Sequence, residues 1–193
     1  MAQANKGVNK LRIIGGEWRS RQLPFIDAPS LRPTPNRVRE TLFNWLQGDI
    51  AGARCLDLFA GSGAIAFEAL SRYAAEVVLV EMHKKAAKQL TENLSILEGE
   101  SESRGLVVNQ DALKYVASSP EPFDVIFLDP PYRKNFLPTV LDQVNSLALL
   151  KPGGVIYLEH EREESFDWSD WGLEVIKQSK AGQVMCFLLK KGA

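Results

Sequence analysis

The segment Leu56-Asp57-Leu58-Phe59-Ala60-Gly61-Ser62-Gly63 indicates the fold class of this chain. It places two glycines directly after a short apolar run and just before a helical pattern that begins near Gly63. Glycine permits positive φ and lets a ligand approach the backbone closely, and the first amides of the helix point at that ligand. In an open α/β sheet, ligands bind beyond the carboxyl ends of the strands at such a turn. The candidate binding residues of this loop are Asp57, Ala60, Gly61, Ser62 and Gly63.

An acidic residue ends the next apolar run. Glu81 lies twenty positions after Gly61, where a carboxylate can accept hydrogen bonds from both hydroxyls of a ribose. The spacing Gly61-x-Gly63-x-x-Ala66 satisfies the dinucleotide fingerprint, but S-adenosylmethionine presents an adenosine to the same loop and acid. The loop leaves both cofactors open, together with the plainer alternative of a tight turn that binds nothing.

From Ala53 onward, short apolar runs alternate with helical patterns, which is typical of βαβ units and a mostly parallel sheet. The last two runs flank Lys180-Ala181-Gly182 and predict a terminal antiparallel hairpin. The predicted strands are Arg54–Leu58, Glu76–Glu81, Gly105–Asn109, Phe123–Asp129, Val155–Glu159, Leu173–Lys177 and Gln183–Lys190, with helices near 63–72, 84–97, 112–118 and 137–150. We therefore expect an α/β fold with a seven-stranded sheet.

The N-terminal region has a different organisation. Leu11–Ile14 and Trp18–Leu23 flank a glycine turn and predict a β-hairpin, and a proline-punctuated connector follows it. Thr34-Pro35 predicts a helix start, with Thr34 as N-cap and about three turns ending near Gly48. We expect a hairpin arm and connector over 1–33, and one domain with its leading helix over 34–193.

Composition bounds the function classes. A hydrophobic fraction of 45% over 193 residues excludes a disordered chain and fits one domain. No apolar stretch approaches the roughly 18 residues of a membrane span, no secretory leader is visible, and Cys55 and Cys186 match no disulfide or metal-ligand spacing, so we expect a cytoplasmic protein without metal.

The net charge of −1 conceals an asymmetry. Residues 1–47 carry eight Lys and Arg against three Asp and Glu, a net charge of +5, so the rest of the chain carries −6. A basic arm on an acidic domain indicates a polyanionic partner, although a solvated surface is the plain alternative.

Asp129-Pro130-Pro131-Tyr132 follows the fourth predicted strand and is the most specific signal in the chain. Two prolines deny the segment backbone donors, so it offers carbonyl oxygens and one carboxylate. Such an acceptor-only edge suits a planar amino group with two N–H donors, and accepting both bonds favours a more tetrahedral, nucleophilic nitrogen. The Asp129 carboxylate and the Pro130 carbonyl are the candidate acceptors, and Tyr132 can stack on a base.

These motifs resemble the class I S-adenosylmethionine-dependent methyltransferases, and most closely the RsmD family of bacterial 16S ribosomal RNA (guanine-N2)-methyltransferases. The resemblance rests on Arg12–Gly16, Trp18-Arg19, Leu31–Thr34, Arg37–Leu46, Phe59–Gly63 and Asp129–Tyr132. It implies a Rossmann-like fold, S-adenosylmethionine as methyl donor, and one guanine of an assembled or assembling small ribosomal subunit as substrate. The chain departs from the family at Asn36, where Asp is usual, and at Tyr132, where many members carry Phe.

The other candidate residues follow from this interpretation. Met82 beside Glu81, and Asp111 with Ala112, are candidates for the adenosine, although Asp111 can equally cap the helix that begins at Ala112. Arg37 or Arg39 is a candidate for the methionine carboxylate. The predicted RNA-binding residues are Arg12, Trp18, Arg19, Arg21 and Arg32, with Trp18 equally interpretable as the cover of a small core. We expect a monomer, and a solvated loop at 159–164.

Three alternatives stay open. A DNA adenine-N6 methyltransferase would use the same acceptor edge, but no extra DNA-recognition domain is obvious in so short a chain. A nicotinamide-dependent oxidoreductase would use the same glycine loop, but Asp129–Tyr132 has no place in hydride transfer. A non-catalytic ribosome-assembly factor would keep the fold without the reaction.

Overall fold

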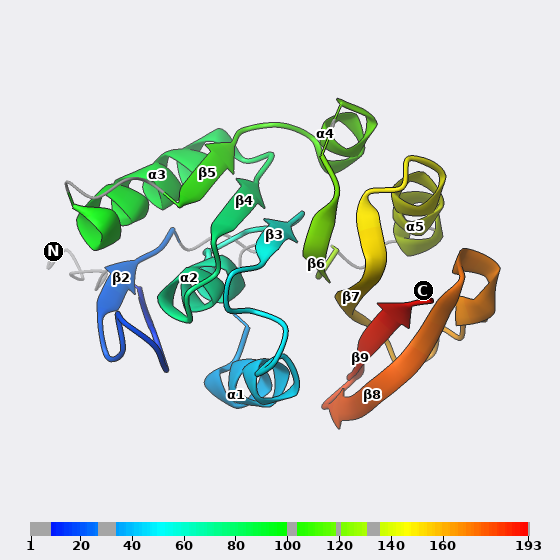
Figure 1. Ribbon diagram of the computed structural model, residues 1–193. Coiled ribbons are helices and arrows are strands. Elements are labelled where there is room, and N and C mark those ends of the chain that lie inside the picture. Colours follow the sequence, from blue (N-terminus) through cyan, green and yellow to red (C-terminus); the bar gives the residue numbers. More distant parts are fainter. Residues whose placement is uncertain (1–8, 27–33, 100–103, 119–120, 131–135, 193) are drawn as a thin grey trace, which may run out of the picture.

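The computed structural model describes residues 9–26, 34–99, 104–118, 121–130 and 136–192. Its centre is a seven-stranded sheet in the order β5-β4-β3-β6-β7-β9-β8 (Figure 1). The strands are β3 (Arg54–Asp57), β4 (Glu76–Val80), β5 (Gly105–Val108), β6 (Phe123–Leu128), β7 (Leu150–Glu161), β8 (Leu173–Ala181) and β9 (Val184–Lys191). The first five are parallel, whereas β9 pairs antiparallel with both β7 and β8. The predicted mostly parallel sheet with a terminal antiparallel hairpin is confirmed.

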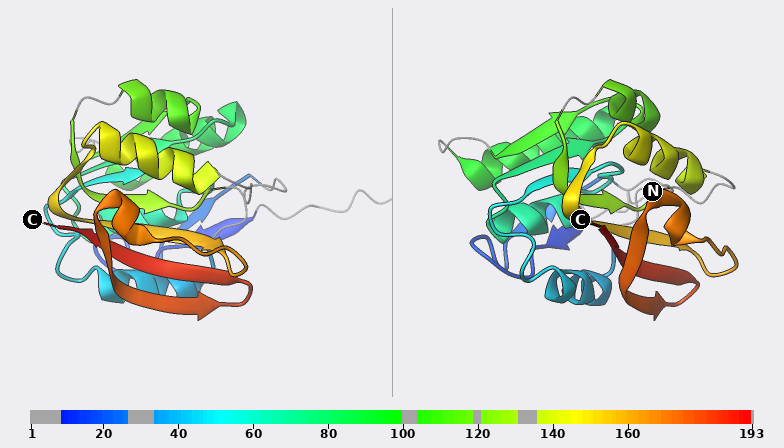
Figure 2. Two further views of the ribbon diagram at one scale, coloured as in Figure 1. Left: turned by 90° about the vertical axis from the view of Figure 1, so that its right-hand side faces the viewer. Right: turned by 45° about the vertical axis from the view of Figure 1, so that its right-hand side comes forward.

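Helices cover both faces of the sheet because the central strands β3, β4, β6 and β7 bury consecutive side chains, which point to opposite faces. The helices are α1 (Asn36–Trp45), α2 (Ala64–Ser71), α3 (Lys84–Glu98), α4 (Ala112–Ser118), α5 (Phe136–Ser146) and a 3₁₀ turn, η1 (Trp168–Trp171). One core joins α1, α2 and α3 to residues such as Cys55 and Phe127. A second core joins α4, α5 and η1 to alternating residues such as Leu56 and Leu128. Figure 2 shows the sheet between these two layers.

The order of the sheet determines where a ligand can bind. The chain runs from β3 outward through β4 to β5, and then returns to the other side of β3 as β6. The connections on the two sides of β3 therefore diverge and leave the carboxyl ends of β3, β4 and β6 accessible to a ligand. Within the described ranges, no helix is long and apolar enough to cross a membrane.

The N-terminal hairpin packs onto the first core. Its strands β1 (Lys10–Arg12) and β2 (Gln22–Pro24) are antiparallel and shorter than predicted, because the segment between them turns back to bond helix α2. Leu11, Ile13, Trp18 and Leu23 belong to the same buried cluster as the residues of α2 and α3.

Three local predictions are corrected by the structure. The N-cap of α1 is Pro35 rather than Thr34. Helix α5 ends at Ser146 rather than near 150, because the chain turns at Ala148 with a φ of 51° so that β7 can begin. The expected solvated loop at 159–164 is wrong for its first half: β7 continues to Glu161, and His160 is buried among Phe166, Trp168 and Phe187. Only the exposed turn at Arg162 and Glu163 agrees with the expectation.

Candidate active site

The glycine loop between β3 and α2 is held in one conformation by backbone hydrogen bonds within the loop and to β4. The amide of Ala60 donates to the Val80 carbonyl at 2.9 Å, and the amide of Gly63 donates to the Ala60 carbonyl at 2.7 Å. Gly61 and Gly63 both have positive φ, at 53° and 79°. A Cβ at Gly63 would lie 2.3 Å from the Phe67 ring, so glycine is required here by both conformation and space.

Asp57, the last residue of β3, holds this loop through hydrogen bonds of its buried side chain. Its side chain is buried and accepts hydrogen bonds from the backbone amides of Phe59 and Ala66. Burial raises the pKa of Asp57 to about 7, with a further contribution from the neighbouring Glu81 carboxylate, and the two amide hydrogen bonds oppose the shift. The contacts of Asp57 therefore connect the end of β3 to the turn and to the first residues of α2.

Glu81 follows β4 and faces the same loop. Its Oε2 accepts from the Gly61 amide at 2.9 Å and its Oε1 from the His83 amide at 2.6 Å. A carboxylate has about four lone-pair sites, so these two bonds orient the group and leave two sites for the hydroxyls of a ribose. The residues present therefore fit an adenosine, and Met82 next to Glu81 has an exposed side chain at the same edge.

Asp111 precedes helix α4 in the structure. Its Oδ1 accepts from the Lys114 amide at 3.1 Å, which is the N-cap interaction that the sequence left as one of two interpretations. Ala112 is buried as the first residue of the helix. A role of either residue toward an adenine stays a prediction.

Asp129 and Pro130 lie just beyond the carboxyl end of β6. Because side chains alternate along a strand, Asp129 points to the same face of the sheet as Phe127, and Phe127 pairs with Asp57 of β3. Burial, and then the Glu159 and Asp57 carboxylates, raise the pKa of Asp129 to about 8. Pro131 and Tyr132 lie outside the described residues.

Glu159 is a site residue that the sequence analysis missed. Leu128 of β6 pairs with Leu158 of β7, so the next rung places Asp129 beside Glu159. The Tyr157 hydroxyl donates to Glu159 Oε1 at 2.7 Å, and both side chains are buried. The sequence can show that a polar residue ends an apolar strand. It cannot show which residue of the neighbouring strand lies beside it.

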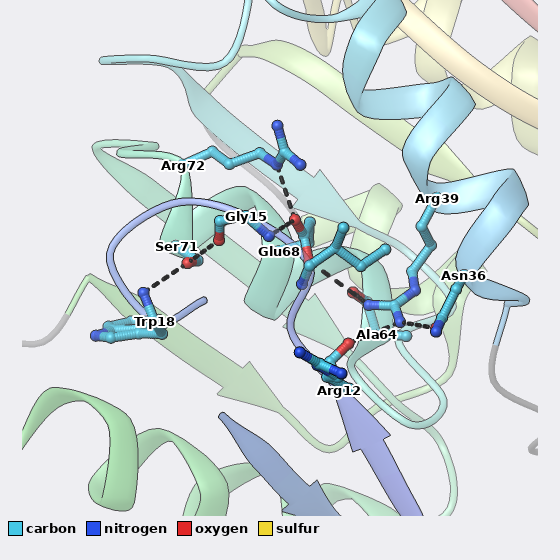
Figure 3. A network of polar contacts seen from close by, with 10 residues as sticks. Arg12, Gly15, Trp18, Asn36, Arg39, Ala64, Glu68, Ser71 and Arg72 are labelled. Atoms are coloured by element: carbon cyan, nitrogen blue, oxygen red, sulfur yellow. Dashed lines mark hydrogen bonds and ion pairs between the residues drawn. The ribbon is translucent and has the colours of Figure 1, made fainter. Parts of the chain in front are cut away.

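The two arginines predicted near the cofactor have different surroundings, and those of Arg39 are drawn in Figure 3. Arg39 is 1% exposed and forms a buried ion pair with Glu68 of α2 at 3.6 Å. Its guanidinium also donates to the Asn36 side chain, to the Arg12 carbonyl and, at 3.4 Å, to the Ala64 carbonyl. These contacts direct Arg39 to the arm and to α2, so of the two candidates for a carboxylate ligand only Arg37 has an exposed side chain.

Helix α2 also binds the hairpin directly. Glu68 accepts from the Ile14 and Gly15 amides at 2.8 Å each, and Ser71 accepts from the Trp18 amide at 2.9 Å (Figure 3). Trp18 is 4% exposed and its ring lies under the Arg104 guanidinium. This placement favours the core-cover interpretation of Trp18 over base stacking.

The remaining arm residues lie at the surface. The side chains of Arg12, Arg19 and Arg21 are exposed, with Arg12 bonded to the Ser20 hydroxyl and Arg21 to the Leu97 carbonyl. Arg32 lies outside the described residues. Among the described residues, no group of three or more His, Cys, Asp or Glu side chains could hold a metal ion.

Comparisons with known proteins identify the family. Residues 11–190 match the model described as "Conserved hypothetical protein 95". Ribosomal RNA small subunit methyltransferase D of Escherichia coli K12 is 42% identical over 191 residues, which is 98% of this chain and 94% of that protein. The chain belongs to the RsmD family. The Haemophilus influenzae member is 44% identical over 84% of each chain.

The fold agrees with this family. The structure of Escherichia coli yhhF superposes with a TM-score of 0.85 at 41% identity, covering 96% of this chain and 99% of that one. A member of the RsmD family is an enzyme, a methyltransferase, and its fold and family are those of S-adenosylmethionine users. Membership of this family therefore favours a methyl donor over a dinucleotide as the ligand of the glycine loop and Glu81.

Proposed function

We propose that this protein transfers a methyl group from S-adenosylmethionine to the exocyclic N2 of one guanine in the 16S rRNA of the small ribosomal subunit. The observation that carries this proposal is the position of Asp129 and Pro130, which adjoin the end of β6, next to β3 and its glycine loop. The names of the relatives support the substrate, because they describe ribosomal RNA small subunit methyltransferases.

The segment from Asp129 to Tyr132 must hold and orient a weakly nucleophilic nitrogen. The Asp129 carboxylate and the Pro130 carbonyl accept hydrogen bonds from the two N–H groups of the guanine amino group, and Tyr132 stacks on the base. Held in this way, the nitrogen lone pair is less delocalised into the ring and points at its target. Orientation of this kind can supply about 7–11 kcal/mol of the barrier.

The donor site is assigned to the loop and the ends of β3 and β4. Gly61, Ser62 and Gly63 offer backbone amides, Glu81 accepts the ribose hydroxyls, and Met82 and Asp111 flank the adenine. Arg37 is the candidate for the methionine carboxylate. When bound, S-adenosylmethionine supplies an electrophilic methyl group, so the residues need to provide orientation rather than a metal or a covalent nucleophile.

The substrate and setting follow from the same proposal. Arg12, Arg19, Arg21 and Arg32 of the arm contact RNA phosphates of a small subunit or its assembly intermediate. This is supported by the exposed side chains of Arg12, Arg19 and Arg21, because exposed cationic side chains bind the RNA backbone. We propose a cytoplasmic enzyme that works as a monomer.

Incubation of purified small subunits with methyl-labelled S-adenosylmethionine, followed by mapping of the labelled base, tests the proposal. We expect label on the N2 of a single guanine of 16S rRNA, and none with Asp129→Ala. Label on adenine would contradict the proposed substrate, and full activity of Asp129→Ala would contradict the mechanism. Calorimetric uptake of NAD in place of S-adenosylmethionine would indicate an oxidoreductase, and uptake of neither would indicate an assembly factor.

A further inference from the structure

The acid next to Asp129 carries an inference that rests on the proposed function and deepens it. Asp129 lies beside Glu159 of β7, one residue beyond the pair Leu128 and Leu158, and Glu159 pairs in turn with Cys186 of β9. Two carboxyl groups thus lie side by side at the carboxyl edge of the sheet. Glu159 is 7% exposed and Asp129 is partly buried, so water screens this pair less than it would two acids at the surface.

Tyr157 determines which oxygen of Glu159 is occupied. Tyr157 is 1% exposed and lies two residues before Glu159 on the same face of β7. Its hydroxyl donates to Glu159 Oε1 at 2.7 Å, and a hydrogen bond of this kind stabilises the ionised form of a carboxyl group. Burial raises the pKa of both acids, but the Tyr157 hydrogen bond opposes that shift at Glu159, and no described hydrogen bond opposes it at Asp129, so the shared proton of the pair is directed toward Asp129.

The other titratable groups that face the pair come from neighbouring strands. Asp57 of β3 adds a second carboxylate next to Asp129, and Glu81 after β4 in turn acts on Asp57. Cys186 of β9 faces the pair as a neutral thiol, because burial raises the pKa of Cys186 to about 11. Burial also raises the pKa of Tyr157, so its hydroxyl stays protonated. Among the described residues, the charges that raise the pKa of Asp129 are thus the carboxylates of Glu159 and Asp57.

We propose that Glu159, held by Tyr157, is a positioning residue for methyl transfer: it shares one proton with Asp129 and thereby keeps Asp129 from ionising until a guanine amino group arrives. The N–H donors of that group favour the ionised Asp129, and the shared proton passes to Glu159 or to water. In the reaction the nitrogen forms its bond to the methyl carbon as the donor S–C bond breaks, with that electron pair left on sulfur. The nitrogen then loses one proton to Asp129, which returns it to water.

The pH dependence of methylation distinguishes this role from a purely structural one. Since Asp129 must be ionised to accept from the amino group, kcat/KM for small subunits should rise with pH. Glu159→Gln removes the neighbouring carboxylate, so Asp129 should ionise more easily and the rising limb should move to lower pH by about one unit or more. Tyr157→Phe should move the limb in the same direction, because Glu159 then retains the shared proton.

Glu161→Gln is the matched control, since Glu161 lies on the same strand and is exposed. The rising limb of its kcat/KM against pH should coincide with that of the wild type. Thermal melts and calorimetric binding of S-adenosylmethionine establish that each variant is folded, and if Glu159→Gln does not fold, Tyr157→Phe decides the question.

A limb that stays at the wild-type pH in the folded variants would overturn the proposal, and so would activity lost equally at every pH. Failure of the proposed function gives a different result, since the wild type itself would then transfer no methyl group to guanine.

Discussion

At the scale of single residues, the surroundings that the proposed reaction requires of Asp129 also lower the stability of the folded chain. The proposed reaction needs an acceptor that can ionise beside two other carboxylates. Among the described residues, no positively charged group offsets the negative charge of these carboxylates at Asp129. Burial and these neighbours hold the pKa of Asp129 at about 8, against about 3.9 for an aspartate in an unfolded chain. Between those pH values the folded chain binds more protons than the unfolded one, so the free energy of unfolding contributed by Asp129 falls as pH rises.

Asp129→Asn should therefore stabilise the fold at alkaline pH while it abolishes methyl transfer. The amide carries no charge, so we expect little difference in the free energy of unfolding near pH 4 and a gain over the wild type of about 1–2 kcal/mol near pH 8. Urea unfolding at both pH values measures this gain. A variant that is less stable than the wild type at pH 8 would contradict the assigned environment.

Asp124→Asn provides the comparison of opposite sign. Burial alone would raise the pKa of Asp124, but hydrogen bonds from Lys151 and the Arg54 amide outweigh it and lower the pKa. This stabilisation is present above the ordinary pKa of an aspartate and is lost as pH falls below it, so Asp124→Asn should lower the free energy of unfolding near neutral pH.

At the scale of elements, helix α2 is the part of the fold to which both the loop and the arm are attached. Its first residue, Ala64, follows the glycine loop, and its carbonyl accepts from Arg39. One turn later, Glu68 accepts the Ile14 and Gly15 amides of the arm and pairs with Arg39 and Arg72. Glu68 is fully buried, so these partners are needed to compensate for the charge.

Glu68→Gln should release the arm and destabilise the chain. Removal of the negative charge leaves the Arg39 guanidinium buried without its ion-pair partner, and we expect the free energy of unfolding to fall by about 3 kcal/mol. Urea unfolding measures the loss, and limited proteolysis should cut within 9–26 faster than in the wild type.

Glu92→Gln is the matched control, because Glu92 forms an exposed pair with Lys88 on the surface of α3. Exposed pairs contribute little, so this change should stay within about 0.5 kcal/mol of the wild type. Equal losses for the two variants would mean that the buried contacts of Glu68 do not hold the arm.

At the scale of the whole molecule, charge is distributed unevenly. The chain carries 23 basic and 24 acidic residues, yet its first 47 residues have a net charge of +5. In the structure the hairpin lies on the side of α2 and α3, toward one end of the sheet, whereas β8 forms the opposite edge (Figure 1). An RNA phosphate backbone would be drawn to the hairpin end, while the acids of the candidate active site lie at the carboxyl ends of the central strands.

Arg19→Ala with Arg21→Ala should weaken methylation of small subunits without changing the binding of S-adenosylmethionine. Each lost phosphate contact lowers the salt dependence of binding, so the log–log slope against salt should become shallower by about 1–2. Single-turnover methylation over a salt series measures both effects.

Lys177→Ala with Lys180→Ala removes two exposed charges from β8 and should behave like the wild type. Unchanged activity and slope in the arm variant would refute an RNA-binding role for the hairpin.

The order of strands and helices along the chain, the glycine loop followed by Glu81, and an acceptor edge at Asp129 could all be predicted from the sequence, because each prediction depends on periodicity or on residues close together in the chain. The groups that surround Asp129, and the contacts of Arg39 and Trp18, became known from the three-dimensional packing. Glu159 lies thirty positions after Asp129, and Glu68 lies twenty-nine after Arg39. Strand register and helix packing bring these pairs together, and they are long-range properties that no local pattern records.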